Sequence, residues 1–219
     1  MRANGHRWKV FLLVGLLIAA GAVWALFPRD SSEPARVTAD EYVYATSGFE
    51  SVDALGGARH DYPPSTGIEV EETAGGRCRV ISWRPLEGRV TEWKLCGNRL
   101  VSIHESHDFF GNPDERTYRC EPGSSIRDGW TCSYGGATET ATGGVVGRED
   151  FDGQRVEHVR LDRRIEGDVE GTGVRQFWLR PDGFPVKLTG TTDDVSPSPI
   201  GDVRYLERFV LTLESTPED

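Results

Sequence analysis

Several motifs that commonly carry chemistry are missing from this chain of 219 residues. It has no Gly-x-Ser-x-Gly nucleophile elbow, and its glycine pairs at 135–136 and 143–144 lack the lysine of a phosphate-binding loop. Its four cysteines include no Cys-x-x-Cys pair, so the spacing of thioredoxin-like redox sites and of zinc ribbons is absent. We therefore assign no catalytic residue and no cofactor, and we predict that the protein is not an enzyme.

Long apolar runs are equally scarce, and the single one covers residues 10–27. About 18 residues span roughly 27 Å as a helix, close to the hydrocarbon thickness of a bilayer. Arg2, Arg7 and Lys9 precede the run, which places the N-terminus in the cytoplasm and the rest outside. The run predicts the signal anchor of a single-pass plasma-membrane protein. The alternative is a signal peptide cleaved near residues 20–22, which would release a secreted protein.

The charge balance is acidic, with a formal net charge of −10 although basic residues gather near the N-terminus. The remainder of the chain is thus more acidic than the whole, and it should repel nucleic acids and anionic lipid headgroups. We expect no nucleic-acid partner. The expected contacts are the membrane, through residues 10–27, and a protein or lipid of the cell envelope.

Export makes disulfides the expected state of the cysteines, because an even count in an oxidising compartment favours them over metal ligands. A hairpin about Glu87 places Cys78 opposite Cys96. Directly opposed strand residues have Cβ atoms about 4.5–5.5 Å apart, near what a disulfide tolerates. Cys120 and Cys132 flank a second turn region. Among the three connectivities, we predict the pairs Cys78–Cys96 and Cys120–Cys132.

The rest of the pattern is overwhelmingly that of β-strands. Apolar and polar residues alternate at 184–191 and 203–214, and Asp152-Gly153 is a strong two-residue hairpin signal. The stretch before the β-rich region is polar and contains proline and serine, as a linker does. The expected organisation is a cytoplasmic basic tip at 1–9, the anchor at 10–27, a linker at 28–40 and an extracytoplasmic β domain at 41–216.

One segment of the β domain has a helical pattern. Ser47 and Glu50 match a capping box, apolar residues at 49, 52 and 55 recur at helical spacing, and Gly56-Gly57 would end the helix. The predicted fold is therefore mainly β, a curved antiparallel meander with one or two short helices, preceded by one transmembrane helix.

The second half of the chain resembles the periplasmic lipoprotein-carrier superfold of the LolA, LppX/LprG and MucB/RseB-like domains. Two motifs carry the resemblance: Gly-x-Glu-x-x-x-Gly in the stretch 147–153, and Trp178-Leu179 followed by Gly183, Pro185 and Val186. The resemblance covers about 90 residues and implies an open half-barrel whose concave face holds acyl chains or a partner. The whole chain also resembles membrane-anchored extracytoplasmic proteins of actinobacteria.

The half-barrel implied by this resemblance predicts an apolar concave face. The expected function is an extracytoplasmic binding domain for a lipid or a partner protein of the envelope. The alternative is a structural or protein-interaction module without a ligand cavity, and a third hypothesis is a hydrolase of envelope polymers. The residues expected on the concave face are Ile81, Trp83, Trp93, Leu95, Trp178, Phe184, Val186, Leu188, Tyr205 and Phe209.

Histidine and carboxylate side chains supply the strongest candidates for a metal site or for catalysis. His104, His107 and Asp108 combine ligand types that suit zinc. However, residues three apart on a strand face opposite ways, and no third histidine has a recognised spacing, so we assign no metal. His60-Asp61 would suit an oriented base, but a polar turn before two prolines explains the pair more simply.

Overall fold

The computed structural model describes residues 40–53, 57–73, 75–109, 112–198 and 201–215. These residues belong to one compact unit, Val37–Asp219. The basic tip at 1–9, the anchor at 10–27 and nearly all of the linker at 28–40 lie outside them. Within the described ranges, no helix is long and apolar enough to cross a membrane.

The described part of the chain consists of β-strands joined by turns. All its strand pairs are antiparallel, and strands that follow one another in sequence are neighbours from β3 to β13. The strands are β1 Asp40–Val52, β2 Ala58–Asp61, β3 Ser65–Thr73, β4 Cys78–Leu86, β5 Arg89–Cys96, β6 Arg99–Phe109, β7 Asn112–Cys120, β8 Gly129–Tyr134, β9 Ala137–Phe151, β10 Gln154–Gly167, β11 Glu170–Leu179, β12 Pro185–Ser196 and β13 Val203–Ser215.

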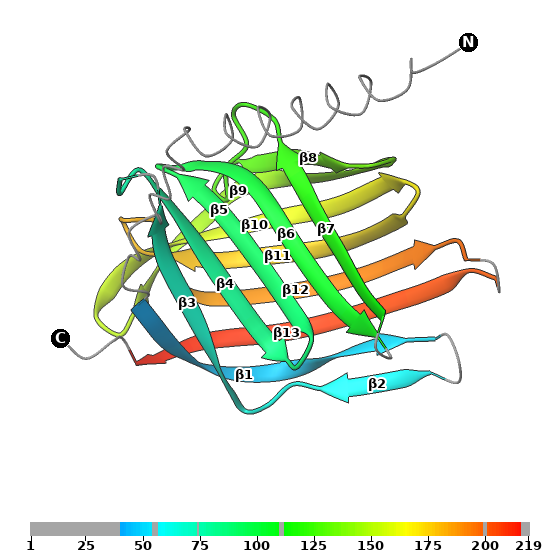
Figure 1. Cartoon of the computed structure of the whole chain (residues 1–219). Coiled ribbons are helices and arrows are strands. Elements are labelled where there is room, and N and C mark those ends of the chain that lie inside the picture. The colour runs from blue at the N-terminus through cyan, green and yellow to red at the C-terminus, as the bar shows by residue number, and fades with distance from the viewer. Residues whose placement is uncertain (1–39, 54–56, 74, 110–111, 199–200, 216–219) are drawn as a thin grey trace, which may run out of the picture. The chain divides into compact units, whose positions relative to one another are not determined.

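The sheet closes on itself, because its first long strand also pairs with its last (Figure 1). Residues 43–52 of β1 pair antiparallel with residues 205–215 of β13. On its other side β1 pairs first with β3 and then, nearer its C-terminal end, with the short β2. The ring thus consists of β1 and β3 to β13. The expectation of an open half-barrel was wrong, since the two edges of such a sheet are here hydrogen-bonded to each other.

The expectation of short helices was also wrong for the described residues, which contain none. Residues 47–52, the start of the predicted helix, lie in β1 between β13 and β2. Burial alternates along this strand, with Thr46, Glu50 and Val52 all nearly covered. Tertiary pairing on both sides therefore overrides a local capping pattern, as it commonly does for short segments. Of the predicted stop signal Gly56-Gly57, residue 56 lies outside the described residues, and Gly57 lies in the turn before β2 with a φ of 77°.

The predicted hairpins and both disulfides are confirmed. Cys78 pairs with Cys96, and Ile81 faces Trp93 in the register expected for a turn about Glu87. The second bridge joins Cys120 to Cys132, which are directly opposed on β7 and β8. Asp152 and Gly153 form the β9–β10 turn with φ angles of 50° and 74°, which suit a tight hairpin.

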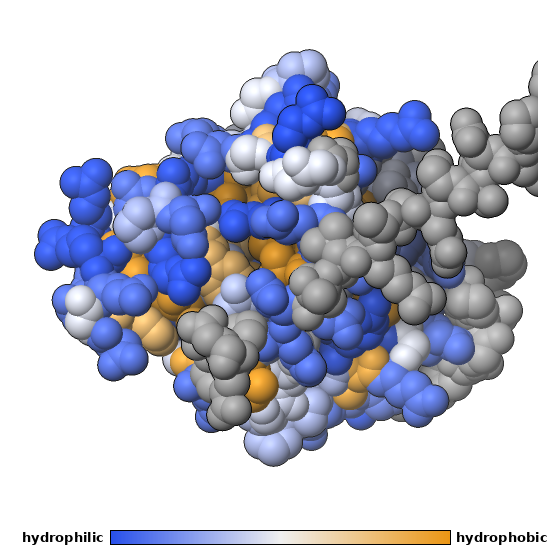
Figure 2. Space-filling view, turned by 60° about the vertical axis from the view of Figure 1, so that its left-hand side comes forward, coloured by the Kyte–Doolittle hydropathy of each residue, from blue (hydrophilic) through white to orange (hydrophobic). Residues whose placement is uncertain are grey.

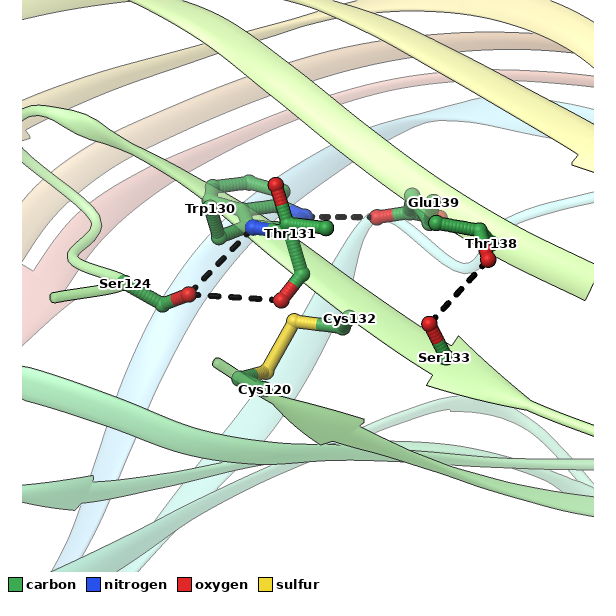
Figure 3. The surroundings of a disulfide bond; sticks show 8 residues. All are labelled: Cys120, Ser124, Trp130, Thr131, Cys132, Ser133, Thr138 and Glu139. Atoms are coloured by element: carbon green, nitrogen blue, oxygen red, sulfur yellow. Dashed lines mark hydrogen bonds between the residues drawn. A yellow bond between two sulfur atoms is a disulfide. The ribbon is translucent and has the colours of Figure 1, made fainter. Parts of the chain in front are cut away.

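Hydrogen bonds surround the Cys120–Cys132 bridge (Figure 3). The hydroxyl of Ser124 accepts from the backbone N–H of Thr131 at 3.2 Å. On the opposite strand edge, the hydroxyls of Ser133 and Thr138 lie 3.1 Å apart. The bridge therefore joins β7 and β8 beside a turn that is also held by its own polar contacts.

Alternate side chains fill the interior with one continuous apolar core. Tyr44, Trp83, Leu161 and Leu179 are among its fully covered members. A second, smaller cluster gathers Val156, Trp178 and Val186. The face shown in Figure 2 is mainly hydrophilic, with hydrophobic areas between the charged and polar side chains.

Gly48 provides a test of ring closure, because it lies where β1 pairs with β13. Its φ is +142°, and a Cβ there would overlap the carbonyl oxygen of Arg208 and lie 2.7 Å from the Cα of Phe209. We expect Gly48→Ala to lower the free energy of unfolding by about 2–4 kcal/mol, through backbone strain and disrupted pairing. Urea unfolding measures this change.

Gly147→Ala is the matched control, since a Cβ at residue 147 meets nothing within 4 Å and its φ is not positive. That variant should stay within about 0.5 kcal/mol of the wild type. Equal stability of the two variants would contradict the closed ring.

Candidate functional site

A cavity of about 300 Å³ lies inside one end of the ring; we call it the lumenal cavity. Its lining includes Val52, the last residue of β1, together with Ser196 and Val203, where β12 ends and β13 begins. The cavity thus lies at the end of the ring where β1 ends. The other lining residues are Arg89, Glu105, His107, Asp114, Arg116, Tyr118, Arg163, Val169, Arg175, Thr192, Asp194, Tyr205 and Glu207.

The period of a β-strand explains why so many lining residues occur two apart. Side chains two residues apart on a strand point to the same face. Four strands each place such a pair on the cavity wall. Near this end of the ring, several of these inward positions carry charged residues. The pairs are Glu105 and His107 on β6, Arg116 and Tyr118 on β7, Thr192 and Asp194 on β12, and Tyr205 and Glu207 on β13.

Arg89, on β5, is the centre of one buried ionic cluster. It lies 3.2 Å from Glu207 and 3.7 Å from Glu50, so it bridges the two strands whose pairing closes the ring. Tyr62 donates its hydroxyl to Glu207 at 2.7 Å. Burial alone would raise the pKa of Glu207, but the charges of Arg89 and Arg175 and these hydrogen bonds outweigh it and lower the pKa to about 2. Glu207 is thus ionised at neutral pH.

Arg163, on β10, is the centre of the second cluster. Its Nε donates to Glu139 at 2.7 Å, while its two terminal nitrogens donate to the two carboxylate oxygens of Asp194 at 2.7 and 3.0 Å. Trp130 also donates to Glu139, at 2.8 Å (Figure 3). Although burial opposes ionisation of Glu139, the charges of Arg163 and Arg175 outweigh it and lower the pKa of this carboxyl. The cluster ties β9, β10 and β12 together at the cavity wall.

Glu105 differs from the other acidic residues of the cavity wall. Within the part of the chain that the structure describes, its carboxylate forms no hydrogen bond and no ion pair within 4 Å, whereas Asp114, Asp194 and Glu207 each have an arginine partner. Burial raises the pKa of Glu105, although the charge of Arg89 partly opposes this. The Glu105 carboxyl is therefore open to a hydrogen bond from a molecule inside the cavity.

His107 lies beside Glu105 on the same wall and contacts Arg89. The Nη1 of Arg89 donates to the Nε2 of His107, which requires a neutral imidazole at that nitrogen. Burial lowers the pKa of His107, and the positive charge of Arg89 lowers it further, to about 2. The imidazole is therefore an acceptor rather than a cation at physiological pH.

The residues expected on a concave apolar face are divided among several places. Trp93 is half-buried against the main core, Trp178 and Val186 lie in the second cluster, and Tyr205 lines the lumenal cavity. In β12 the register against β11 shifts near Val186, which changes the side-chain alternation that places Leu188 in the core. The remaining six are packed in the core: Ile81, Trp83, Leu95, Phe184, Leu188 and Phe209.

The histidine candidates are only partly separated. His104 hydrogen-bonds Thr117 at 2.9 Å on an exposed part of β6, whereas His107 faces the cavity. Asp108 is exposed, and together with His107, and with His60 and Asp61 of β2, it lines a more open hollow of about 480 Å³ near the β4–β5 turn. Among the described residues, no group of three or more His, Cys, Asp or Glu side chains is arranged to hold a metal ion.

No protein-family model matches this chain, and no curated protein matches its sequence. The site must therefore be interpreted from its own geometry.

Sequence reasoning missed most of the charged residues of the site. The mixed-charge stretch at 160–175 is typical of an exposed hairpin, yet Arg163 is only 5% exposed. One available signal was the position of Glu207 between Tyr205 and Phe209 on an alternating strand, which places a carboxylate on the apolar, inward face.

Arg163 and its exposed neighbour Arg164 allow a matched test of the second cluster. Arg163→Met should lower the free energy of unfolding by about 3–5 kcal/mol, because it leaves Glu139 and Asp194 buried without their cation. Arg164 is exposed and pairs with Glu166 at 2.6 Å. Arg164→Met should therefore cost less than about 0.5 kcal/mol. Equal losses in urea unfolding would refute the buried cluster.

His107 predicts an acid-dependent loss of stability. Its pKa is about 2 in the folded protein, against about 6.5 for the unfolded chain. Below pH 6.5 the unfolded state binds the additional proton, so stability falls as the pH decreases. Between pH 6.5 and 5 this single group should cost about 2 kcal/mol.

His107→Gln keeps a neutral acceptor near Arg89 and should remove this part of the slope. His104→Gln, on the exposed side of the same strand, should retain it because His107 is unchanged. Urea unfolding of the three proteins across this pH range measures the difference, and parallel curves would show that His107 does not titrate as described.

Proposed function

We propose that this chain is an extracytoplasmic binding domain that holds a small, neutral, polar molecule inside the lumenal cavity. The observation that carries the proposal is a partly open cavity of about 300 Å³ lined by many ionisable side chains. Small-molecule sites commonly measure ~300–1,000 Å³, so this cavity lies at the lower end of that range.

The charges of the wall favour a neutral ligand over an ion. Four arginines and four acidic residues line the cavity. Most of them already neutralise one another, as Arg89 does with Glu207 and Arg163 with Asp194. A ligand with a net charge would have to compete with these pairs or face a like charge. A neutral molecule can use the remaining N–H groups and carboxylate oxygens without disturbing them.

The same wall argues for a polar molecule rather than an acyl chain. Most of the surface that faces the cavity is apolar, and Val52, Val169, Val203, Tyr118 and Tyr205 contribute to it. An acyl chain, however, would bury the charged side chains of the wall without giving them any hydrogen bond, at a large cost in desolvation. The apolar side chains first considered for lipid binding are instead mostly packed together in the core.

The cellular setting of the proposal is the outer side of the plasma membrane. Two disulfides between opposed strands suit an oxidising compartment. The apolar run at residues 10–27, after three basic residues, would then be the anchor, with release by cleavage as the alternative. In this setting the domain would capture a small molecule outside the cell, without catalysing a reaction on it.

A thermal-shift screen of the full-length protein with its disulfides formed tests the proposal. The probes are neutral polyols and sugars, with alkyl carboxylates, alkyl amines and short fatty acids as comparison classes. We expect a neutral polar class to raise the melting temperature, because a ligand that binds only the folded state stabilises it. Stabilisation by fatty acids alone would favour the lipid-binding alternative.

Two valines provide a matched pair of variants for this screen. Val203→Trp should abolish the ligand-induced shift, because Val203 lines the cavity and an indole would occupy it. Val146→Trp should retain the shift, because Val146 is exposed on β9. If no probe shifts the wild type and native mass spectrometry finds no bound small molecule, the domain is an interaction module without a ligand.

A further inference from the structure

A second and much smaller cavity, of about 20 Å³, adjoins the lumenal cavity; we call it the deep pocket. The two spaces share Arg89, Glu105, Arg175 and Glu207 in their linings. The deep pocket also reaches core residues, including Trp83, Trp130 and Phe209. A space of ~10–15 Å³ suffices for one water molecule, so this pocket has room for one water-sized group.

Unsatisfied hydrogen-bonding atoms are concentrated around the deep pocket. Among the described residues, four buried side-chain atoms have no hydrogen-bond partner, and three of them belong to residues that line this pocket. The three atoms are the Nε1 of Trp83, the Nε of Arg89 and the Oγ1 of Thr91. Their side chains are only 1–5% exposed. Buried polar atoms without partners are rare, because each has lost its hydrogen bonds to water without a replacement. Because three such atoms belong to residues that line one cavity, we expect a molecule or group to occupy it.

The chemistry of these atoms defines the occupant. The N–H groups of Trp83 and Arg89 can only donate, so the occupant must offer an oxygen that accepts. Glu105 lines the same pocket and has no partner of its own among the described residues, so the occupant should also donate. A carboxylate is disfavoured, because three acidic side chains line the pocket against two arginines. A hydroxyl group both accepts and donates, carries no charge and fits the volume.

We propose that the lumenal ligand is a polyol or sugar, and that one of its hydroxyl groups enters the deep pocket, where it accepts from Trp83 and Thr91 and donates to Glu105. The proposal rests on the proposed function, since it names the class of ligand for the same site. Thr91 thus contacts the ligand directly, through a buried hydroxyl that has no other partner among the described residues, whereas the Nε of Arg89 lies 3.7 Å from Glu50.

Deoxy sugars test the inference on the full-length protein. Calorimetry first identifies which of glycerol, myo-inositol, glucose, galactose and mannose binds most tightly. The deoxy analogues of that compound, each lacking one hydroxyl, are then compared. We expect one analogue to bind at least tenfold more weakly, because a site built to hydrogen-bond a hydroxyl is left with unpaired groups when that hydroxyl is missing.

The Thr91→Val variant tests whether the recognised hydroxyl lies in the deep pocket. The variant should fold with unchanged or increased stability, because it removes a buried hydroxyl that has no partner. In the Thr91→Val variant, the ratio of the affinities for the parent compound and for the discriminating analogue should fall at least threefold. Thr91→Ser, which keeps the hydroxyl, should restore discrimination by most of that factor.

The other outcomes overturn the inference. Equal affinity for every deoxy analogue would mean that the deep pocket holds an ordered water only, while the proposed function would stand. Unchanged discrimination in Thr91→Val would place the recognised hydroxyl elsewhere in the lumenal cavity. If no polyol or sugar binds at millimolar concentration, the ligand class is wrong, and the thermal-shift screen decides the proposed function separately.

Discussion

The antiparallel pairing of β1 with β13 joins two segments that are more than 150 residues apart in the sequence, and the interior of the domain depends on it. A closed ring has no free edge between its first and last strands, and it encloses every inward side chain. The pairing also brings Glu50 on β1 and Glu207 on β13 within reach of the same guanidinium, that of Arg89 on β5. Without closure, these carboxylates would lie at opposite edges of a sheet.

The closed ring encloses two chemically different regions. Apolar side chains such as Trp83 and Leu211 pack into a continuous core, while ionisable residues line the lumenal cavity. Buried charges are generally paired, and Arg89 and Arg163 each form ion pairs with two carboxylates. At the boundary between the two regions the pairing is incomplete, around Glu105 and the three unsatisfied atoms. That incompleteness, rather than the size of the cavity alone, is the basis for proposing a ligand with hydroxyl groups.

Short-range features were accessible from the sequence. The Cys78–Cys96 register and the Asp152-Gly153 turn depend on residues close in the chain, where turn chemistry and side-chain alternation are decisive. The helix prediction at 47–52 failed for the opposite reason. Its capping pattern is local, whereas one of the two strands that pair with it, β13, is more than 150 residues away in the sequence. At Val186 a register shift interrupted the alternation on which the predicted concave face relied. The lumenal site was missed because charged residues on these strands suggested a solvated surface.

The sequence alone determined the β class, the hairpins and both disulfide pairs, because each follows from periodicity, turn residues and cysteine spacing over a few tens of residues. Only the tertiary structure decided whether the sheet is open or closed, which follows from the meeting of β1 and β13. It also decided which charges are buried: Arg163 is enclosed and Arg164 is not, although both belong to the same charged stretch. Strand alternation sets the face of each residue, but ring closure determines that one face becomes an interior.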